Sequence, residues 1–193
     1  MLKSVFVLLS FVTLMSGSVA LAGLAEDFEA LKPIPRDYTD AGSICEEVAR
    51  LRVADQYPAP QYKVETGIAY ANATRTIGEL DVIVFDLNTN KVIKLGEVKC
   101  WKDAAGGLRK AKDQRARFLQ NVRSSIPLRF MSTSNHQAYS HDQFRYVNDF
   151  ISIAQKGTTA VGYDMELEYT LNEFQTLRLK MIQCQKQGEC AKP

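Results

Sequence analysis

Three residues in the central part of the chain, Asp81, Glu97 and Lys99, have the types and spacing expected of a hydrolytic metal site. They lie in two strand-like runs, 79–86 and 92–101, which are joined by turn-forming residues at 87–91. If the turn centres on Thr89, Asp81 lies opposite Glu97 and Glu79 lies opposite Lys99. Because side chains alternate along a strand, Asp81, Glu97 and Lys99 are then expected to share one face of a β-hairpin.

Two carboxylates that face each other across a hairpin repel, and a bound divalent cation would remove that repulsion. Oxygen ligands favour Mg²⁺, Mn²⁺ or Ca²⁺, and Mg²⁺ commonly needs only one or two carboxylates besides water and substrate phosphate. Lys99 could then orient a water molecule, accept its proton or stabilise charge on a phosphate. The alternative is a surface Asp beside an ordinary Glu-x-Lys ion pair, since a register shift of one residue would put the two carboxylates on opposite faces.

The elements that must position these residues follow from hydrophobic periodicity and from turn residues. We expect residues 23–40 to form a polar, Pro-containing lead-in that runs along the surface. Beyond it, we expect helices at about 43–57, 142–154 and 171–185, and a further helix that follows a break at Gly106-Gly107 and runs to about 123. We expect strands at about 62–70, 79–86, 92–101, 128–131 and 159–165. The sequence has no internal repeat and no low-complexity linker, so residues 23–193 are expected to form a single α/β domain.

Taken together, these motifs resemble the PD-(D/E)XK nuclease superfamily, especially its Holliday-junction-resolvase-like and restriction-endonuclease-like members. The similarity rests on an acid on an early helix, a Gly-Glu-Leu-Asp segment ending at Asp81, a hairpin, the triplet Glu97-Val98-Lys99 and a helix that carries Gln114. It covers about residues 42–131, and it differs from the family at Leu80, where many members have Pro. The resemblance implies an αβββαβ core with a mixed central sheet flanked by helices, here followed by a C-terminal α/β extension.

The same resemblance implies roles for individual residues. Asp81, Glu97 and the Val98 carbonyl would bind Mg²⁺ or Mn²⁺, and Lys99 would activate or position the attacking water. Gln114 would lie near the site. Either Glu46 or Glu47 would be the helical acid, with a small preference for Glu46.

The distribution of charge favours a polyanionic partner. The formal net charge is only +2, but residues 91–129 contain eleven Lys or Arg and three acids. Basic side chains beside an acidic metal site suit a phosphodiester backbone, although a solvated helix face would look similar. The residues expected to contact nucleic acid are Lys102, Arg109, Lys112 and Arg115. Trp101 could stack on a base or belong to the core.

These observations predict a secreted, Mg²⁺-dependent nuclease that hydrolyses DNA phosphodiester bonds; RNA is not excluded. The alternative is a secreted nucleic-acid-binding or interaction module that keeps the fold without turnover. Junction-cleaving members of the family often dimerise, so a homodimer is one expected assembly. Ordinary globular composition, 46% hydrophobic and 24% charged, argues against disorder, collagen and coiled coil.

The first 22 residues are typical of a signal peptide, with Lys3, an apolar run from Val5 to Met15 and a small-x-small site that ends at Ala22. Cleavage there would leave 171 residues (193 − 22) with no membrane segment, in a secreted or periplasmic location. The four cysteines, Cys45, Cys100, Cys184 and Cys190, allow two disulfides in an oxidising compartment. We favour Cys45–Cys100 with Cys184–Cys190, although sequence permits three pairings. A Cys45–Cys100 bridge would tie the helical acid to the metal strand.

Overall fold

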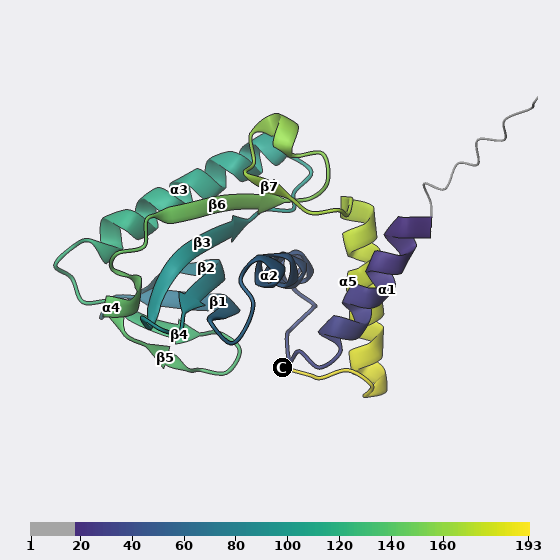
Figure 1. The fold of residues 1–193 in the computed structure, drawn as a ribbon, viewed down its shortest axis with the longest axis horizontal. Coiled ribbons are helices and arrows are strands. Elements are labelled where there is room, and N and C mark those ends of the chain that lie inside the picture. Colours follow the sequence, from purple (N-terminus) through teal and green to yellow (C-terminus); the bar gives the residue numbers. More distant parts are fainter. Residues whose placement is uncertain (1–17) are drawn as a thin grey trace, which may run out of the picture.

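A computed structural model describes residues 18–193, with side chains from residue 23 onward. The protein is an α/β structure with a seven-stranded mixed sheet in the order β5-β4-β1-β2-β3-β6-β7 (Figure 1). The strands are β1 (Tyr62–Ala71), β2 (Thr76–Asp86), β3 (Lys91–Val98), β4 (Arg129–Ser132), β5 (Ala138–Tyr139), β6 (Asp149–Ala154) and β7 (Met165–Glu166). The helices are α1 (Ser18–Leu31), α2 (Ser43–Gln56), α3 (Ala104–Val122), α4 (His141–Phe144) and α5 (Leu171–Gln187), with one 3₁₀ turn, η1 (Thr159–Val161).

The central sheet separates two hydrophobic clusters. On one side Val82 and Val84 of β2 pack with residues of α1, α2 and α5, and in Figure 1 α1 and α5 lie side by side. On the other side Ile83 and Phe85 of β2 pack with Phe118 of α3. Because side chains alternate along a strand, Asp81 lies on the same face as Ile83 and Phe85. The Asp81 side chain therefore lies on the face of the sheet that α3 covers.

The β2–β3 hairpin has the register that brings Asp81 opposite Glu97. Val82 pairs with Gly96 and Val84 pairs with Lys94, and the register shifts by one residue only between Val84 and Phe85, on the turn side. Strand β3 ends at Val98, earlier than expected, so Lys99 is the first residue beyond the strand.

Helix α3 approaches Lys99 closely because its first turns are rich in small residues. It begins at Ala104, capped by Asp103, whose side chain accepts a hydrogen bond from the Gly106 amide. The expectation that Gly106-Gly107 would precede the helix is therefore wrong; the Asp103 cap starts it earlier. A Cβ atom on Gly107 would lie 2.6 Å from the Tyr163 hydroxyl oxygen and 3.3 Å from Lys99 Cβ.

Two segments outside the central hairpin differ from expectation. The lead-in at 23–40 begins as helix α1, because Leu24 and Leu31 bury one side of it in the cluster that also contains α5. The helix expected at 142–154 is a single turn, α4, followed by strand β6. The β-branched residues Ile151 and Ile153 pair with β3 in parallel, and this pairing overrides the helical reading.

The strand that completes the crossover from β3 through α3 is β6, which lies beyond the range 42–131. Strand β4, expected at 128–131, pairs with β1 and so lies toward the opposite edge of the sheet from β6. An αβββαβ order is formed by α2, β1, β2, β3, α3 and β6, with β4, β5 and α4 inserted before β6. Where a strand was expected at 159–165, the structure has the 3₁₀ turn η1 and then the two-residue strand β7. Residues 162–164 separate them, and Gly162 has φ of 104°.

Gly107→Ala should destabilise the protein by about 1–3 kcal/mol, because the added methyl group overpacks the junction of α3 with Lys99 and Tyr163. Urea denaturation measures the change in the free energy of unfolding. The matched control is Gln120→Ala on the exposed side of the same helix, which should change stability by less than about 0.5 kcal/mol. Equal effects of the two substitutions would contradict the close packing at Gly107.

Candidate active site

Asp81, Glu97 and Lys99 form a buried cluster in which the Lys99 ammonium lies among three oxygen atoms. Lys99 Nζ is 2.7 Å from Asp81 Oδ2, 2.9 Å from the Val98 carbonyl oxygen and 3.4 Å from Glu97 Oε2. Asp81 Oδ2 also accepts a hydrogen bond of 2.8 Å from the Val98 amide. All three side chains are less than a tenth exposed. The ammonium thus contacts the same three groups that the sequence predicts as metal ligands.

Burial and mutual repulsion alter the protonation of this cluster. Burial and then the Asp81 carboxylate raise the pKa of Glu97 to about 8, although Lys99 opposes the rise. Burial lowers the pKa of Lys99, but the Asp81 and Glu97 carboxylates outweigh it and raise that pKa overall. At neutral pH the cluster therefore keeps Lys99 charged and Glu97 largely protonated.

Of the two candidate helical acids, the structure places Glu46 at the cluster and Glu47 away from it. Burial and the Asp81 carboxylate raise the pKa of Glu46 to about 8, which puts the two groups within electrostatic reach. Glu46 Oε2 accepts a hydrogen bond of 2.5 Å from Arg36. Glu47 instead accepts hydrogen bonds from Arg50 Nε and Thr66 Oγ1 at 2.7 and 2.5 Å.

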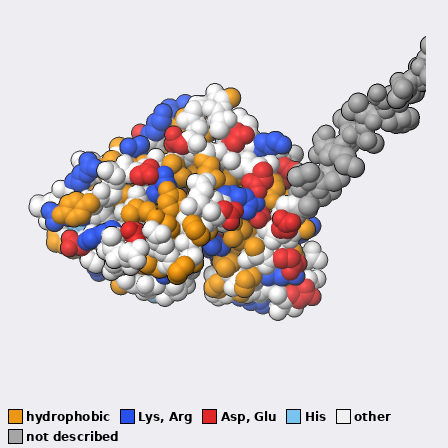
Figure 2. Space-filling view, viewed as in Figure 1, with side chains coloured by type: hydrophobic (Ala, Val, Ile, Leu, Met, Phe, Trp, Pro, Cys, Tyr) orange, Lys and Arg blue, Asp and Glu red, His pale blue; other side chains and the backbone are white. Residues whose placement is uncertain are grey.

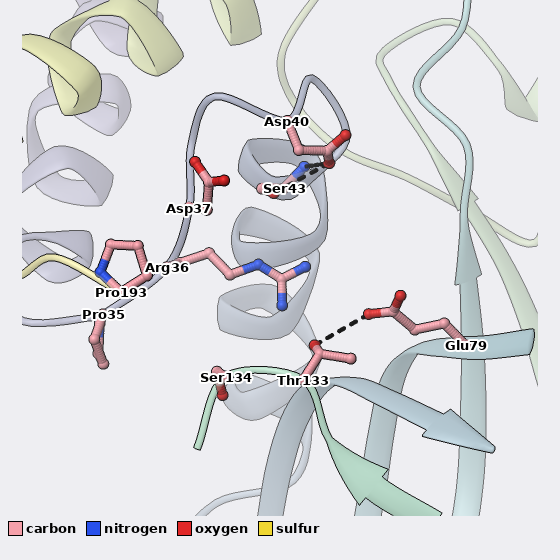
Figure 3. Close-up of a pocket in the computed structure, with 9 residues that line it drawn as sticks. All are labelled: Pro35, Arg36, Asp37, Asp40, Ser43, Glu79, Thr133, Ser134 and Pro193. Carbon is pink, nitrogen blue, oxygen red and sulfur yellow. Dashed lines mark hydrogen bonds between the residues drawn. The ribbon is translucent and has the colours of Figure 1, made fainter. Parts of the chain in front are cut away.

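Arg36 is a member of the site that the sequence did not indicate, since a single Arg between Pro35 and Asp37 carries no motif. Its guanidinium extends from the lead-in toward the sheet, in a pocket of about 290 Å³ that Glu79 and Thr133 also line (Figure 3). Thr133 Oγ1 donates a hydrogen bond of 3.2 Å to Glu79 Oε1. Arg36 thus balances part of the acidic charge of Glu46 and Glu79.

A second pocket, of about 380 Å³, reaches the cluster at Val98 and Lys99. The first turn of α2, the end of β3 and helix α3 line it, and its walls include Glu46, Lys99, Trp101, Lys110 and Gln114. The Gln114 Oε1 atom is buried and has no hydrogen-bond partner. An orphaned acceptor of this kind is costly unless water, a cation or a ligand donor satisfies it.

The donor set suits a hard divalent cation. Carboxylate oxygens of Asp81 and Glu97, with the Val98 carbonyl nearby, are the oxygen ligands that Mg²⁺ or Mn²⁺ accepts. A cation would also displace the protons that burial holds on Glu97 and Glu46. Within residues 18–193 no group of three or more His, Cys, Asp or Glu side chains is arranged to hold a metal ion by itself. Water or substrate phosphate would have to complete the coordination shell.

Comparison with protein-family models, with curated proteins and with solved structures finds no match to this chain. The site is therefore interpreted from its own geometry.

Two disulfides, Cys45–Cys100 and Cys184–Cys190, are formed in the structure. Cys45 precedes Glu46 and Cys100 follows Lys99, so the first bridge joins α2 to the end of β3 directly beside the cluster. The second bridge holds the segment after α5. Both fit a chain that matures in an oxidising compartment.

The expected signal peptide, residues 1–22, lies largely outside the described residues, and residues 18–22 belong to the first turns of α1. Among the residues that the structure describes, no helix is long and apolar enough to cross a membrane.

The basic residues expected to contact nucleic acid lie in three different places around the cluster. Lys102 is exposed near the Cys45–Cys100 bridge. Lys112 and Arg115 line a pocket of about 200 Å³ that Glu97 also lines, and the Arg115 guanidinium lies 4.5 Å from the ring centre of Phe150. Arg109 is exposed and lies 3.9 Å from Asp103. In the space-filling view, Lys and Arg side chains gather along the border of the molecule formed by α3 (Figure 2).

Metal-free protein should lose stability as pH rises from about 4.5 to 8. Glu97 has a higher pKa in the folded than in the unfolded chain, so its contribution to stability is full below about pH 4.5 and is lost as pH passes 8. The loss for one fully linked proton approaches about 1.4 kcal/mol per pH unit. Urea denaturation in the presence of a chelator should show a shallower decline for Glu97→Gln than for wild type. The exposed substitution Glu26→Gln is the control, and parallel curves for wild type and Glu97→Gln would refute the linkage.

Removal of the two disulfides should have unequal consequences. In the loop-entropy relation, the 55-residue separation of Cys45–Cys100 corresponds to about 4 kcal/mol and the six-residue separation of Cys184–Cys190 to about 2 kcal/mol. Cys45→Ser/Cys100→Ser should also diminish any stabilisation by Mn²⁺, measured as a shift in Tm, whereas Cys184→Ser/Cys190→Ser should preserve it. An equal increase in Tm with Mn²⁺ in the two variants would show that the Cys45–Cys100 bridge does not support the site.

Proposed function

We propose that this protein is a secreted, divalent-metal-dependent nuclease that hydrolyses DNA phosphodiester bonds. The observation that carries the proposal is the buried group Asp81, Glu97 and Lys99 at the edge of an open pocket. Two carboxylates and one ammonium held together at low exposure are costly for a protein that uses them only for structure. Together they form a site that can hold a cation and a phosphate at one point.

Each residue has a role that fits its position. Asp81, Glu97 and the Val98 carbonyl would hold Mg²⁺ or Mn²⁺, which when bound stabilises negative charge on a phosphate. Lys99 is flexible enough to move from the carboxylates toward the pocket, where it can hold the attacking water or a phosphate oxygen. Glu46, across the pocket, can hold a water molecule or accept its proton, with Arg36 keeping its side chain in place.

The order of elements gives further support. The path α2, β1, β2, β3, α3 and β6 has the αβββαβ order of the PD-(D/E)XK nuclease superfamily. The hairpin and the following helix carry the acid, acid, lysine and glutamine of that signature in the same sequence order. Lys and Arg side chains along α3 would hold the phosphate backbone on either side of the cut.

A second function is favoured by one specific observation. Lys99 already satisfies Asp81, Glu97 and the Val98 carbonyl, so the cluster is internally balanced without a metal ion. A protein that retained this arrangement would bind nucleic acid through its basic surface without cleaving it. Such binding would depend on salt and not on divalent cations.

Cleavage of supercoiled plasmid and of linear DNA, both double-stranded and single-stranded, with Mg²⁺ or Mn²⁺ tests the proposal. Glu97→Gln and Lys99→Ala should each reduce the rate by roughly 10²–10⁴-fold, because each removes a group that acts on the reacting atoms. Glu46→Gln should also reduce the rate. Glu47→Gln is the matched control, since Glu47 bonds with Arg50 and Thr66 outside the site, and it should retain activity at temperatures where it stays folded.

Circular dichroism and Tm establish that each variant is folded before its rate is compared. Absence of metal-dependent cleavage by the wild type, or cleavage that persists unchanged in both Glu97→Gln and Lys99→Ala, would exclude hydrolysis at this site. An RNA of the same sequence, assayed in parallel, determines the preference between the two nucleic acids.

A further inference from the structure

The pocket beside Lys99 has an aromatic wall that neither the metal site nor the phosphate contacts require. Trp101 lies two residues beyond Lys99, lines the same 380 Å³ pocket and is 41% exposed. At that exposure the indole forms part of the pocket wall and does not belong to the hydrophobic core.

The backbone of Trp101 is fixed in place. Its carbonyl accepts a hydrogen bond of 2.8 Å from Gln155 Nε2, and its amide donates one of 3.2 Å to the Lys99 carbonyl oxygen. The Cys45–Cys100 bridge holds the residue immediately before it. The indole therefore projects from a rigid support at a constant position relative to Lys99, as a stacking surface must.

Two polar groups flank the indole. Lys110 Nζ lies over the ring, 4.6 Å from its centre, and Lys110 is exposed and so free to move onto a phosphate. Gln114 lines the same pocket, and its buried Oε1 atom has no hydrogen-bond partner. An aromatic surface with an exposed cation beside it matches the base and the phosphate of one nucleotide.

We propose that Trp101 is a stacking platform for an unpaired base adjacent to the scissile phosphate, and that the substrate is therefore single-stranded nucleic acid or a single-stranded segment. The inference rests on the proposed nuclease function, because Lys99 is taken as the group that receives the phosphate. A base within a duplex already stacks on its neighbours, so it can reach the indole only after unpairing. A strand that is already unpaired avoids that cost.

The chain contains a single tryptophan, so its intrinsic fluorescence reports on this pocket alone. The Glu97→Gln variant, with both disulfides formed, is kept in chelator. It is titrated with a single-stranded oligonucleotide, with a hairpin duplex and with an abasic oligonucleotide, all with the same number of phosphates. The single strand should quench the fluorescence. The abasic strand, equal in charge, should not, and the duplex should bind at least tenfold more weakly than the single strand.

Substitutions separate stacking from charge. In anisotropy measurements with a labelled single strand, Trp101→Ala should weaken binding roughly 5- to 100-fold, and Trp101→Phe should recover most of that loss. Lys110→Ala is the matched control on the neighbouring helix: it should weaken the single strand and the abasic strand equally. In wild-type background, Trp101→Ala should raise KM for single-stranded substrate with a smaller effect on kcat.

Equal quenching by the abasic strand, equal affinity for duplex and single strand, or unchanged affinity in Trp101→Ala would each overturn the stacking proposal. The binding measurements need neither metal nor turnover, so they succeed or fail independently of cleavage. Base-dependent quenching without cleavage would support the stacking role while rejecting the nuclease. Cleavage with equal KM for wild type and Trp101→Ala would retain the nuclease and reject the stacking role.

Discussion

The arrangement of the site depends on one buried oxygen atom, Asp81 Oδ2, which accepts hydrogen bonds from both the Val98 amide and the Lys99 ammonium. The first bond links β2 to β3 at Val98, where β3 ends. The second holds the Lys99 ammonium against Asp81. Burying such a pair gains little stability, since the desolvation of two charges roughly offsets their attraction. A hydrophobic pair would serve the fold at least as well, so the arrangement is better explained by what it can bind.

The elements around Asp81 are placed to keep this charge cluster close to solvent without exposing it. Gly107 allows α3 to pack directly against Lys99, and the Cys45–Cys100 bridge brings the first turn of α2 to the end of β3. Glu46 consequently faces the cluster while its neighbour Glu47 points to Arg50 and Thr66. One helix thus presents one acid to the pocket and uses the next to attach itself to β1.

The central hairpin could be predicted from sequence because its information is local: alternation of side chains and a single turn set the register that brings Asp81 to Glu97. Strand β6 could not, because Asp149–Ala154 becomes a strand through parallel pairing with β3, about fifty residues earlier in the chain. Arg36 could not be predicted either, because its role depends on a contact with Glu46 in a different element. Exposure of Trp101 likewise depends on where α3 packs, so sequence left both a core and a surface role open.

Specificity in the proposed reaction would follow from the kinds of groups that face the pocket. Lys and Arg side chains along α3 would contact phosphates, and phosphate contacts carry no information about base sequence. Stacking on Trp101 is available to every base, because each has an aromatic face. Besides Gln114, the pocket is lined by the ionisable side chains of the acids Asp40 and Glu46 and of the lysines Lys99 and Lys110. A site of this composition would distinguish paired from unpaired strands more readily than one sequence from another, which would suit the proposed secreted nuclease.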